Sequence, residues 1–250
     1  MQGKTNFMQK ETDQWYTSWF DTPFYHILYK DRDYEEASFF MKKLTSFLNL
    51  SEKSKILDLA CGKGRHAKYL NKIGYNVTGV DLSVSSIEYA KQFESENLHF
   101  EVYDMCLPYP DKFDAVFNLF TSFGYFEKEN DNLRTIKSIK EELKPNGFGV
   151  IDFLNTNYVK NNLVPTEVKT VEGIDFYIHR YLEDGYIFKD IRFTHENERY
   201  FYTERVKALT LEDFKTYFFE AGVKLVSCFG DYQLNEFDEK NSERLILIFN

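Results

Sequence analysis

The chain has 250 residues, with 31 Lys plus Arg against 40 Asp plus Glu, and therefore a formal net charge of −9. This length is enough to bury one large core without disulfides or metal ions. The acidic balance argues against a nucleic-acid partner, because phosphate backbones bind concentrated basic surfaces. The three cysteines show neither CxxC spacing nor a Cys/His cluster, so we expect no disulfide framework and no metal site. They are Cys61, Cys106 and Cys228.

The N-terminal part of the chain is rich in aromatic residues and then follows a helical pattern. Residues 14–30 read QWYTSWFDTPFYHILYK, an irregular aromatic stretch. Apolar side chains recur at helical spacing from Asp33 to Leu48, which predicts a helix there. The first residues lack the apolar centre of a signal peptide, and no run of about 18 apolar residues occurs. We therefore expect a cytoplasmic protein without a membrane segment.

Strands and helices alternate between residues 55 and 155. Helices are predicted over 65–74, over SVSSIEYAKQFESEN (83–97) with Ser83 as its cap, and over about 130–143, where KPNG (144–147) ends the last of them. The predicted strands are KILDLA (55–60), YNVTGVDL (75–82), LHFEVYD (98–104), KFDAVFNLF (112–120) and FGVIDFLN (148–155). This alternation predicts an α/β fold with a parallel sheet and right-handed crossovers.

The alternation stops after residue 155. Residues 166–207 read as three or four antiparallel strands, with a hairpin turn at EDG (183–185), and we interpret them as an insertion. A helix over 209–222 follows, capped by Thr210 and ended by Gly222. Two strands, 223–230 and 243–250, close the chain.

The strongest chemical signal is the segment KILDLACGKGRHA (55–67), in which a strand ends in an acid and a glycine turn leads into a helix. Gly62 and Gly64 let the backbone approach a ligand that a Cβ would exclude. The N–H groups at the helix start favour a carboxylate or a phosphate. Asp58 selects between these ligands, because a carboxylate repels a pyrophosphate but binds an α-ammonium group. S-adenosylmethionine carries both an ammonium and a carboxylate.

Two further acids follow the next two strands. Asp81 closes the second strand, where a carboxylate accepts the hydroxyls of a ribose; the alternative is a helix-capping or solvated acid. Asp104 closes the third strand, where it would accept the adenine amino group; the alternative is an ordinary loop acid. Together with the glycine loop, these acids indicate an adenosine-containing ligand.

These motifs together resemble the class I S-adenosylmethionine-dependent methyltransferase family over about residues 35–155 and 205–250. The segments that carry the resemblance are DLACGKG (58–64), GVDLS (79–83), YDMC (103–106), FDAVFNLFTSFGYF (113–126) and LKPNGFGVIDF (143–153). The resemblance implies a Rossmann-like seven-stranded, mostly parallel sheet with an antiparallel last strand, plus a small inserted antiparallel β-sheet. Residues 51–155 and 208–250 would bind the cofactor, and residues 156–207 would form an inserted sheet that covers the active site. Residues 1–50 would be a helical and aromatic segment, in which Tyr16, Trp19, Phe20 and Tyr25 either form a lid or simply pack.

The resemblance also implies a set of cofactor-binding residues for S-adenosylmethionine and its product S-adenosylhomocysteine. Asp58 would order the loop or meet the ammonium, Asp81 would hold the ribose, and Arg65 would either pair with the cofactor carboxylate or be a solvated helix charge. The full set is Tyr25, Asp58, Ala60, Cys61, Gly62, Gly64, Arg65, Asp81, Leu82, Asp104, Met105, Asn118 and Leu119.

The acceptor is expected to be a small molecule. Members that methylate DNA or amides carry an Asn/Asp-Pro-Pro-aromatic motif after the fourth strand, and this chain has NLFTSFGYF (118–126) there. No residue is identified as a catalytic base. The weak candidates are Tyr125, Tyr177, His179 and His195, and His66 is interpreted as structural rather than as a base.

Two other functions remain open from the sequence. A nicotinamide-dependent oxidoreductase is one, because GKGRHA (62–67) also satisfies G-x-G-x-x-A. The position of Asp58 and the lack of a second nucleotide-binding half argue against it. A non-catalytic protein that binds S-adenosylmethionine is the other.

Overall fold

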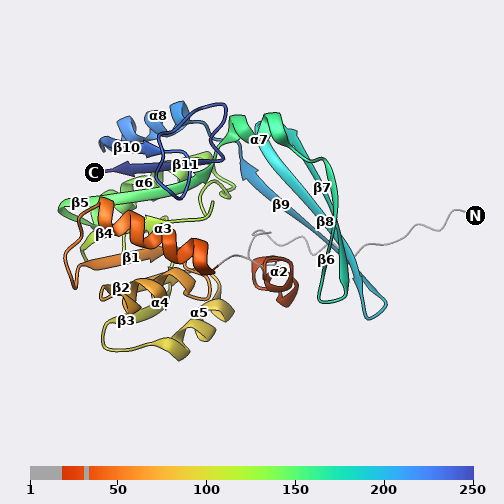
Figure 1. Cartoon of the computed structure of the whole chain (residues 1–250), viewed down its shortest axis with the longest axis horizontal. Coiled ribbons are helices and arrows are strands. Elements are labelled where there is room, and N and C mark those ends of the chain that lie inside the picture. Colours follow the sequence, from red (N-terminus) through yellow and green to blue (C-terminus); the bar gives the residue numbers. More distant parts are fainter. Residues whose placement is uncertain (1–18, 31–33) are drawn as a thin grey trace, which may run out of the picture. The chain divides into compact units, whose positions relative to one another are not determined.

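The structure is a computed structural model that describes residues 19–30 and 34–250 (Figure 1). The contacts divide the chain into two compact units. One contains residues 19–30 and 162–208, and the other contains residues 34–161 and 209–250. The two units are therefore described separately.

The larger unit is built on a seven-stranded sheet with the order β10-β11-β5-β4-β1-β2-β3. β1 to β5 run parallel, whereas β11 is antiparallel to both of its neighbours, β5 and β10. The strands are β1 (Lys55–Leu59), β2 (Asn76–Asp81), β3 (Leu98–Val102), β4 (Phe113–Asn118), β5 (Leu143–Leu154), β10 (Leu225–Phe229) and β11 (Arg244–Phe249). The predicted Rossmann-like sheet with an antiparallel last strand is confirmed.

Helices cover both faces of this sheet (Figure 1). α3 (Tyr34–Phe47), α4 (Arg65–Lys72) and α5 (Val84–Ala90) contribute buried apolar side chains to one core cluster, which includes Ile246 and Ile248 of β11. α6 (Glu129–Glu142) and α8 (Leu211–Ala221) pack against each other, and Phe218 of α8 contacts Phe249 of β11. Successive β11 side chains thus alternate between the two layers, as a strand buried on both faces requires.

The helix ends follow the capping chemistry of the sequence. Ser83 accepts a hydrogen bond from the Ser86 N–H at the start of α5. Thr210 forms a capping box with Asp213 at the start of α8, and Gly222 ends that helix with a φ of 67°. These three predictions are confirmed, and each satisfies backbone groups that a helix end leaves unpaired.

The smaller unit contains a four-stranded antiparallel sheet and the helix α2. The strands are β6 (Thr166–Val171), β7 (Ile174–Glu183), β8 (Tyr186–His195) and β9 (Glu198–Lys207), and the helix is α2 (Pro23–Leu28). EDG (183–185) forms the predicted hairpin turn, with Asp184 and Gly185 at φ of 48° and 79°. Trp19 is fully buried against the sheet and donates to Glu204 at 2.7 Å. The inserted antiparallel sheet is therefore confirmed, with four strands.

Three local features differ from the sequence prediction. A helix, α7 (Thr156–Asn162), occupies the start of the predicted insertion, with the Asn155 side chain accepting from the Asn157 N–H. β5 begins at Leu143, so KPNG lies within the strand, at an irregularity in its register with β4. α5 is shorter than predicted and continues as a 3-10 turn, Lys91–Phe93. Among the described residues, no helix combines the length and apolarity needed to span a bilayer.

Candidate active site at the carboxyl edge of the sheet

The predicted cofactor residues of the larger unit gather where β1, β2 and β4 end. The register pairs Leu59 of β1 with Val80 of β2 on one side and with Asn118 of β4 on the other. The carboxyl ends of parallel strands meet at one edge of a sheet, and ligands of open α/β sheets bind there. The fold therefore brings Asp58, Asp81 and Asn118 to one edge.

Asp58 is a buried acid with an oxygen that has no partner. It is 1% exposed, and burial raises the pKa of its carboxyl group from 3.8 to about 7. The Ala67 N–H in the first turn of α4 hydrogen-bonds the carboxyl group and offsets part of this rise. Oδ2 is buried and has no hydrogen-bond partner among the residues that the structure describes. Burying an acceptor without a hydrogen bond costs free energy, so we expect a ligand to donate a hydrogen bond to this oxygen.

The glycine loop turns three times through the left-handed region, at Ala60, Gly62 and Gly64 with φ of 57°, 53° and 74°. A Cβ on Gly62 would meet nothing within 4 Å, so the space beside this residue is open. A Cβ on Gly64 would lie 2.5 Å from the Phe100 ring. Gly64 is therefore required by internal packing, whereas Gly62 leaves room for a ligand. Cys61 between them is buried.

Asp81 connects the glycine loop to the helix after β2. One of its carboxylate oxygens accepts the Gly62 N–H at 2.8 Å, and the other accepts the Ser83 N–H at 2.8 Å. A carboxylate has about four acceptor positions, so Asp81 can accept several donors at once. Leu82 is 39% exposed beside it.

The remaining predicted residues of this edge follow β3 and β4. Asp104 lies two residues beyond β3, and its side chain accepts the Cys106 N–H at 2.9 Å. The Asn118 amide donates to the Leu59 carbonyl at 3.3 Å and faces the Met105 sulfur at 3.4 Å. Asn118 is fully buried, and within the described part of the chain its Oδ1 has no hydrogen-bond partner. Leu119 is buried at the end of β4.

The two residues after Gly64 pack against Phe120. His66 stacks on the Phe120 ring with centroids 4.7 Å apart, and the Arg65 guanidinium carbon lies 4.7 Å from the centroid of that ring. Arg65 also approaches Nε2 of His66 at 3.0 Å. The interpretation of His66 as structural rather than as a base stays a prediction.

Tyr25 lies on α2 in the smaller unit, and Tyr16 lies outside the described residues. The Tyr25 ring contacts those of Trp19 and Tyr29. Its role toward a cofactor, like the lid role of residues 1–50, stays a prediction. Three of the weak base candidates, Tyr177, His179 and His195, are on the four-stranded sheet as well.

Sequence reasoning missed a buried charged cluster beside β4. Asp152 of β5 is fully buried and pairs with Arg244 of β11, whose Nε lies 2.8 Å from Oδ1. Burial raises the pKa of Asp152, and Arg244, the Phe120 N–H and the Tyr232 hydroxyl offset part of that rise. The signal in the sequence was a charged residue within the apolar strand VIDFL (150–154) and another at the start of the apolar strand RLILIF (244–249). An acid or a base in such a run is expected to be paired.

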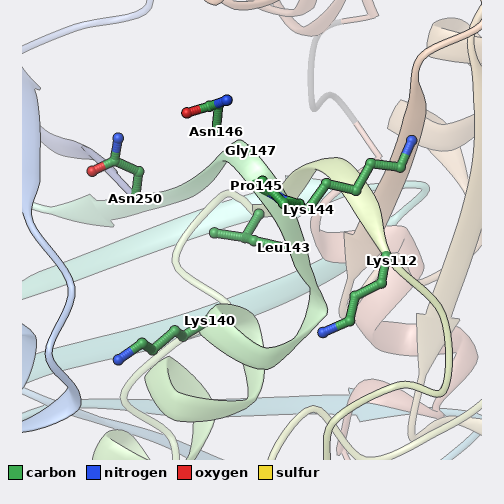
Figure 2. A pocket seen from close by; sticks show the side chains of 8 residues that line it. All are labelled: Lys112, Lys140, Leu143, Lys144, Pro145, Asn146, Gly147 and Asn250. Carbon is green, nitrogen blue, oxygen red and sulfur yellow. The ribbon is translucent and has the colours of Figure 1, made fainter.

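A depression of about 520 Å³ lies at the opposite edge of the sheet, where β4 and β5 begin (Figure 2). Three lysines line it, and each has an acceptor. Lys140 donates to the Ala221 carbonyl, Lys112 to the Glu141 carbonyl, and Lys144 to Asp114. Carbonyls at helix ends and carboxylates are common partners of lysine, so these contacts account for the three lysines structurally.

A comparison with known protein families supports the resemblance to methyltransferases that the sequence motifs indicate. Residues 56–147 match the family described as "Methyltransferase domain". The match covers a little over a third of the chain and identifies this segment as a methyltransferase domain. The NAD-dependent alternative has no support from this match.

Curated relatives align with the methyltransferase domain. YqeM of Bacillus subtilis is 38% identical over 108 residues, which are 42% of this chain and 44% of YqeM. The dTDP-3-amino-3,4,6-trideoxy-alpha-D-glucopyranose N,N-dimethyltransferase of Streptomyces venezuelae is 32% identical over 103 residues, 40% of this chain and 43% of the relative. The chain thus spans less than half the length of these two relatives.

Solved structures share the fold over most of the chain. An S-adenosylmethionine-dependent methyltransferase from Clostridium acetobutylicum superposes with a TM-score of 0.76 at 22% identity, covering 90% of this chain and 94% of the other. The sugar N-methyltransferase KedS8 from Streptoalloteichus superposes with a TM-score of 0.73 at 16% identity, covering 100% and 97%. At these identities the likeness shows the fold alone.

The residues at the carboxyl edge fit S-adenosylmethionine, the cofactor of this domain type. The unpaired Asp58 oxygen would accept from its ammonium, Asp81 would hold its ribose, and the open side of Gly62 gives it room. A diphosphate would instead place negative charge beside a buried carboxyl group, an arrangement that low-dielectric surroundings penalise.

Proposed function

We propose that the chain is an enzyme that transfers a methyl group from S-adenosylmethionine to a small-molecule acceptor. The observation that carries this proposal is the buried Asp58 carboxyl group with its unpaired oxygen, beside an open glycine loop. The Asp58 oxygen suits a ligand with a terminal ammonium group, and the open space beside Gly62 lets that ligand lie close to the backbone.

When bound, the cofactor supplies an electrophilic methyl group on a sulfonium, and the chain supplies position. Asp58 and Asp81 would fix the two ends of the donor, and Asn118 and Leu119 would line the space beside the methyl group. Holding donor and acceptor in line is a proximity effect worth several kcal/mol of the barrier. An amine or hydroxyl acceptor also loses a proton, for which this chain offers no assigned base.

An amine on a sugar is the first acceptor class to test. Relatives and neighbours named as a sugar N-methyltransferase, an amino pentose methyltransferase and an N,N-dimethyltransferase of an amino-trideoxyglucose nucleotide support this choice. The residues after β4, NLFTSFGYF (118–126), lack the Pro-Pro motif of nucleobase amide methyltransferases, which supports the same choice. We attribute acceptor selection to the inserted sheet, because the chain leaves β5 at this edge and reaches that sheet after the short helix α7.

The proposal is tested with S-adenosylmethionine carrying a labelled methyl group and a panel of amino sugars, sugar nucleotides, other amines and phenols. Label should move to at least one acceptor, and the matched variant Asp81→Ala should transfer less label at limiting cofactor, because it binds the cofactor more weakly. Calorimetry on the same protein should show S-adenosylhomocysteine binding and no heat with NAD. Binding of S-adenosylhomocysteine without any methyl transfer would favour the non-catalytic alternative. If neither S-adenosylmethionine nor S-adenosylhomocysteine binds, the enzyme proposal and the non-catalytic alternative both fail.

A further inference from the structure

The buried ion pair Asp152–Arg244 lies next to the end of β4. Asn118 and Leu119, at that end, are the residues proposed to line the space beside the donor methyl group. β5 pairs with β4 so that Ile151 faces Asn118, which places Asp152 one residue further along toward the carboxyl edge. In the other direction Asp152 pairs with Ile246 of β11. A carboxylate at the centre of a sheet needs several donors to remain there.

The donors come from a turn that follows β4 immediately. The Phe120 N–H donates to the Asp152 side chain at 2.8 Å, and the Thr121 N–H donates to the Asp152 main-chain carbonyl at 2.9 Å. Arg244 completes the arrangement, because its guanidinium donates to Asp152 and also to the Thr121 hydroxyl at 2.9 Å. One residue therefore accepts two consecutive amides of the turn.

This turn has a backbone conformation that its residues do not favour. Phe120 and Thr121 have φ of 57° and 59°, in the left-handed region. A β-branched residue such as Thr121 is an outlier there, and such residues persist only where the surroundings hold them. Hydrogen bonds donated by the turn to Asp152, and by Arg244 to Thr121, hold this pair.

The Phe120–Thr121 turn follows β4 and packs against the start of α4, directly after the glycine loop. The conformation of Phe120 places its ring against His66 and Arg65, the first two residues after the glycine loop. The ring also contacts Tyr232 at 5.1 Å, and the Tyr232 hydroxyl approaches Asp152 at 3.3 Å. Moving Phe120 would thus alter both the wall beside Asn118 and the packing of α4.

We propose that Asp152, held by Arg244, is a positioning residue for cofactor binding: it fixes the left-handed Phe120–Thr121 turn, and the turn fixes Asn118, Leu119 and the start of α4. This inference rests on the proposed function, because it deepens the description of the same site. Asp152 acts through the turn and is fully buried itself.

The test compares Asp152→Asn with a matched control, Asp114→Asn. Asp114 also accepts a main-chain N–H, that of Lys55 at 2.7 Å, and a lysine, Lys144 at 2.8 Å, but at the opposite edge of the sheet. Two quantities are measured on the full chain: the hydrogen-exchange rate of the 117–125 peptide, and the dissociation constant of S-adenosylhomocysteine by calorimetry.

In Asp152→Asn the amide hydrogens of the 117–125 peptide should exchange at least tenfold faster. The same variant should bind S-adenosylhomocysteine at least tenfold more weakly. Asp114→Asn should leave the exchange rate and the dissociation constant within about twofold of the wild type, even if it lowers the melting temperature as much as Asp152→Asn does. Arg244→Lys, which keeps the cation, should retain more affinity than Arg244→Met, and this pair decides the matter if Asp152→Asn does not fold.

Wild-type exchange and affinity in folded Asp152→Asn would overturn the inference, and so would equal losses in Asp114→Asn. If the unmodified chain does not bind S-adenosylhomocysteine, the proposed function fails. The exchange rate of the 117–125 peptide then decides by itself whether Asp152 holds the turn.

Discussion

Replacing Asp58 by Asn should remove a pH dependence of cofactor binding that the buried carboxyl group imposes. The pKa of this group is about 7 without a ligand, because burial disfavours its charged form. An ammonium next to Oδ2 would bind the carboxylate and not the neutral acid. Binding therefore releases a proton from the fraction of Asp58 that is still protonated.

The magnitude follows from the pKa. At pH 6 about one tenth of Asp58 is ionised and at pH 8 about nine tenths, so affinity for S-adenosylhomocysteine should rise about tenfold between them. At pH 7 binding should release about 0.5 proton from this group. In Asp58→Asn both effects should disappear, and affinity at pH 8 should fall by about the 1.5–3 kcal/mol of a hydrogen bond to a charged group.

The assay is titration calorimetry at pH 6, 7 and 8 in buffers that differ in ionisation enthalpy, which counts released protons. The ligand's own ammonium titrates identically in both proteins, so the difference belongs to Asp58. Glu142→Gln is a matched control, since burial also raises the pKa of Glu142 to about 7, at the opposite edge of the sheet. A flat wild-type profile, or one that Asp58→Asn retains, would refute the reasoning.

The same pKa predicts how stability depends on pH. The folded-state pKa of Asp58 lies above the ordinary value of 3.8, so its contribution to stability is fully present below about pH 4. That contribution is lost as pH rises through 7, because the unfolded chain ionises more readily. The rise from 3.8 to about 7 corresponds to about 4 kcal/mol of unfolding free energy. Urea unfolding at pH 5 and pH 8 should show a smaller loss for Asp58→Asn than for the wild type.

Three other substitutions separate the parts of the site. Gly64→Ala should destabilise the chain in urea unfolding by about 2–4 kcal/mol, since its Cβ would meet the Phe100 ring at 2.5 Å and its φ is 74°. Gly62→Ala should cost only about 1 kcal/mol yet weaken S-adenosylhomocysteine binding, because its Cβ would enter open space; equal affinities would contradict a ligand at Gly62. Asp81→Ala should weaken the same binding about tenfold to a hundredfold by calorimetry, and unchanged affinity would remove the ribose assignment. Thr210→Ala should lose about 1 kcal/mol of stability with the capping box and leave cofactor affinity as it is; a change in affinity would show that α8 affects the site.

The sequence determined the elements and the chemistry that depends on neighbours along the chain. The glycine loop, the acids at the strand ends and the caps at Ser83, Thr210 and Gly222 are short-range patterns, and each has a local physical cause. Periodicity was enough to predict a parallel sheet and an inserted antiparallel one. It also placed Asp58 and Asp81 at one sheet edge, because strand ends of a parallel sheet coincide.

Only the tertiary structure decided what those residues experience. The raised pKa of Asp58 comes from burial, which depends on the layers of helices around β1. The requirement for glycine at position 64 comes from Phe100, which lies 36 residues away in the chain. Asp152 and Arg244 meet because β11 returns antiparallel beside β5, and strand order over 92 residues is invisible to local patterns. The left-handed turn at Phe120 likewise exists because distant donors and acceptors hold it.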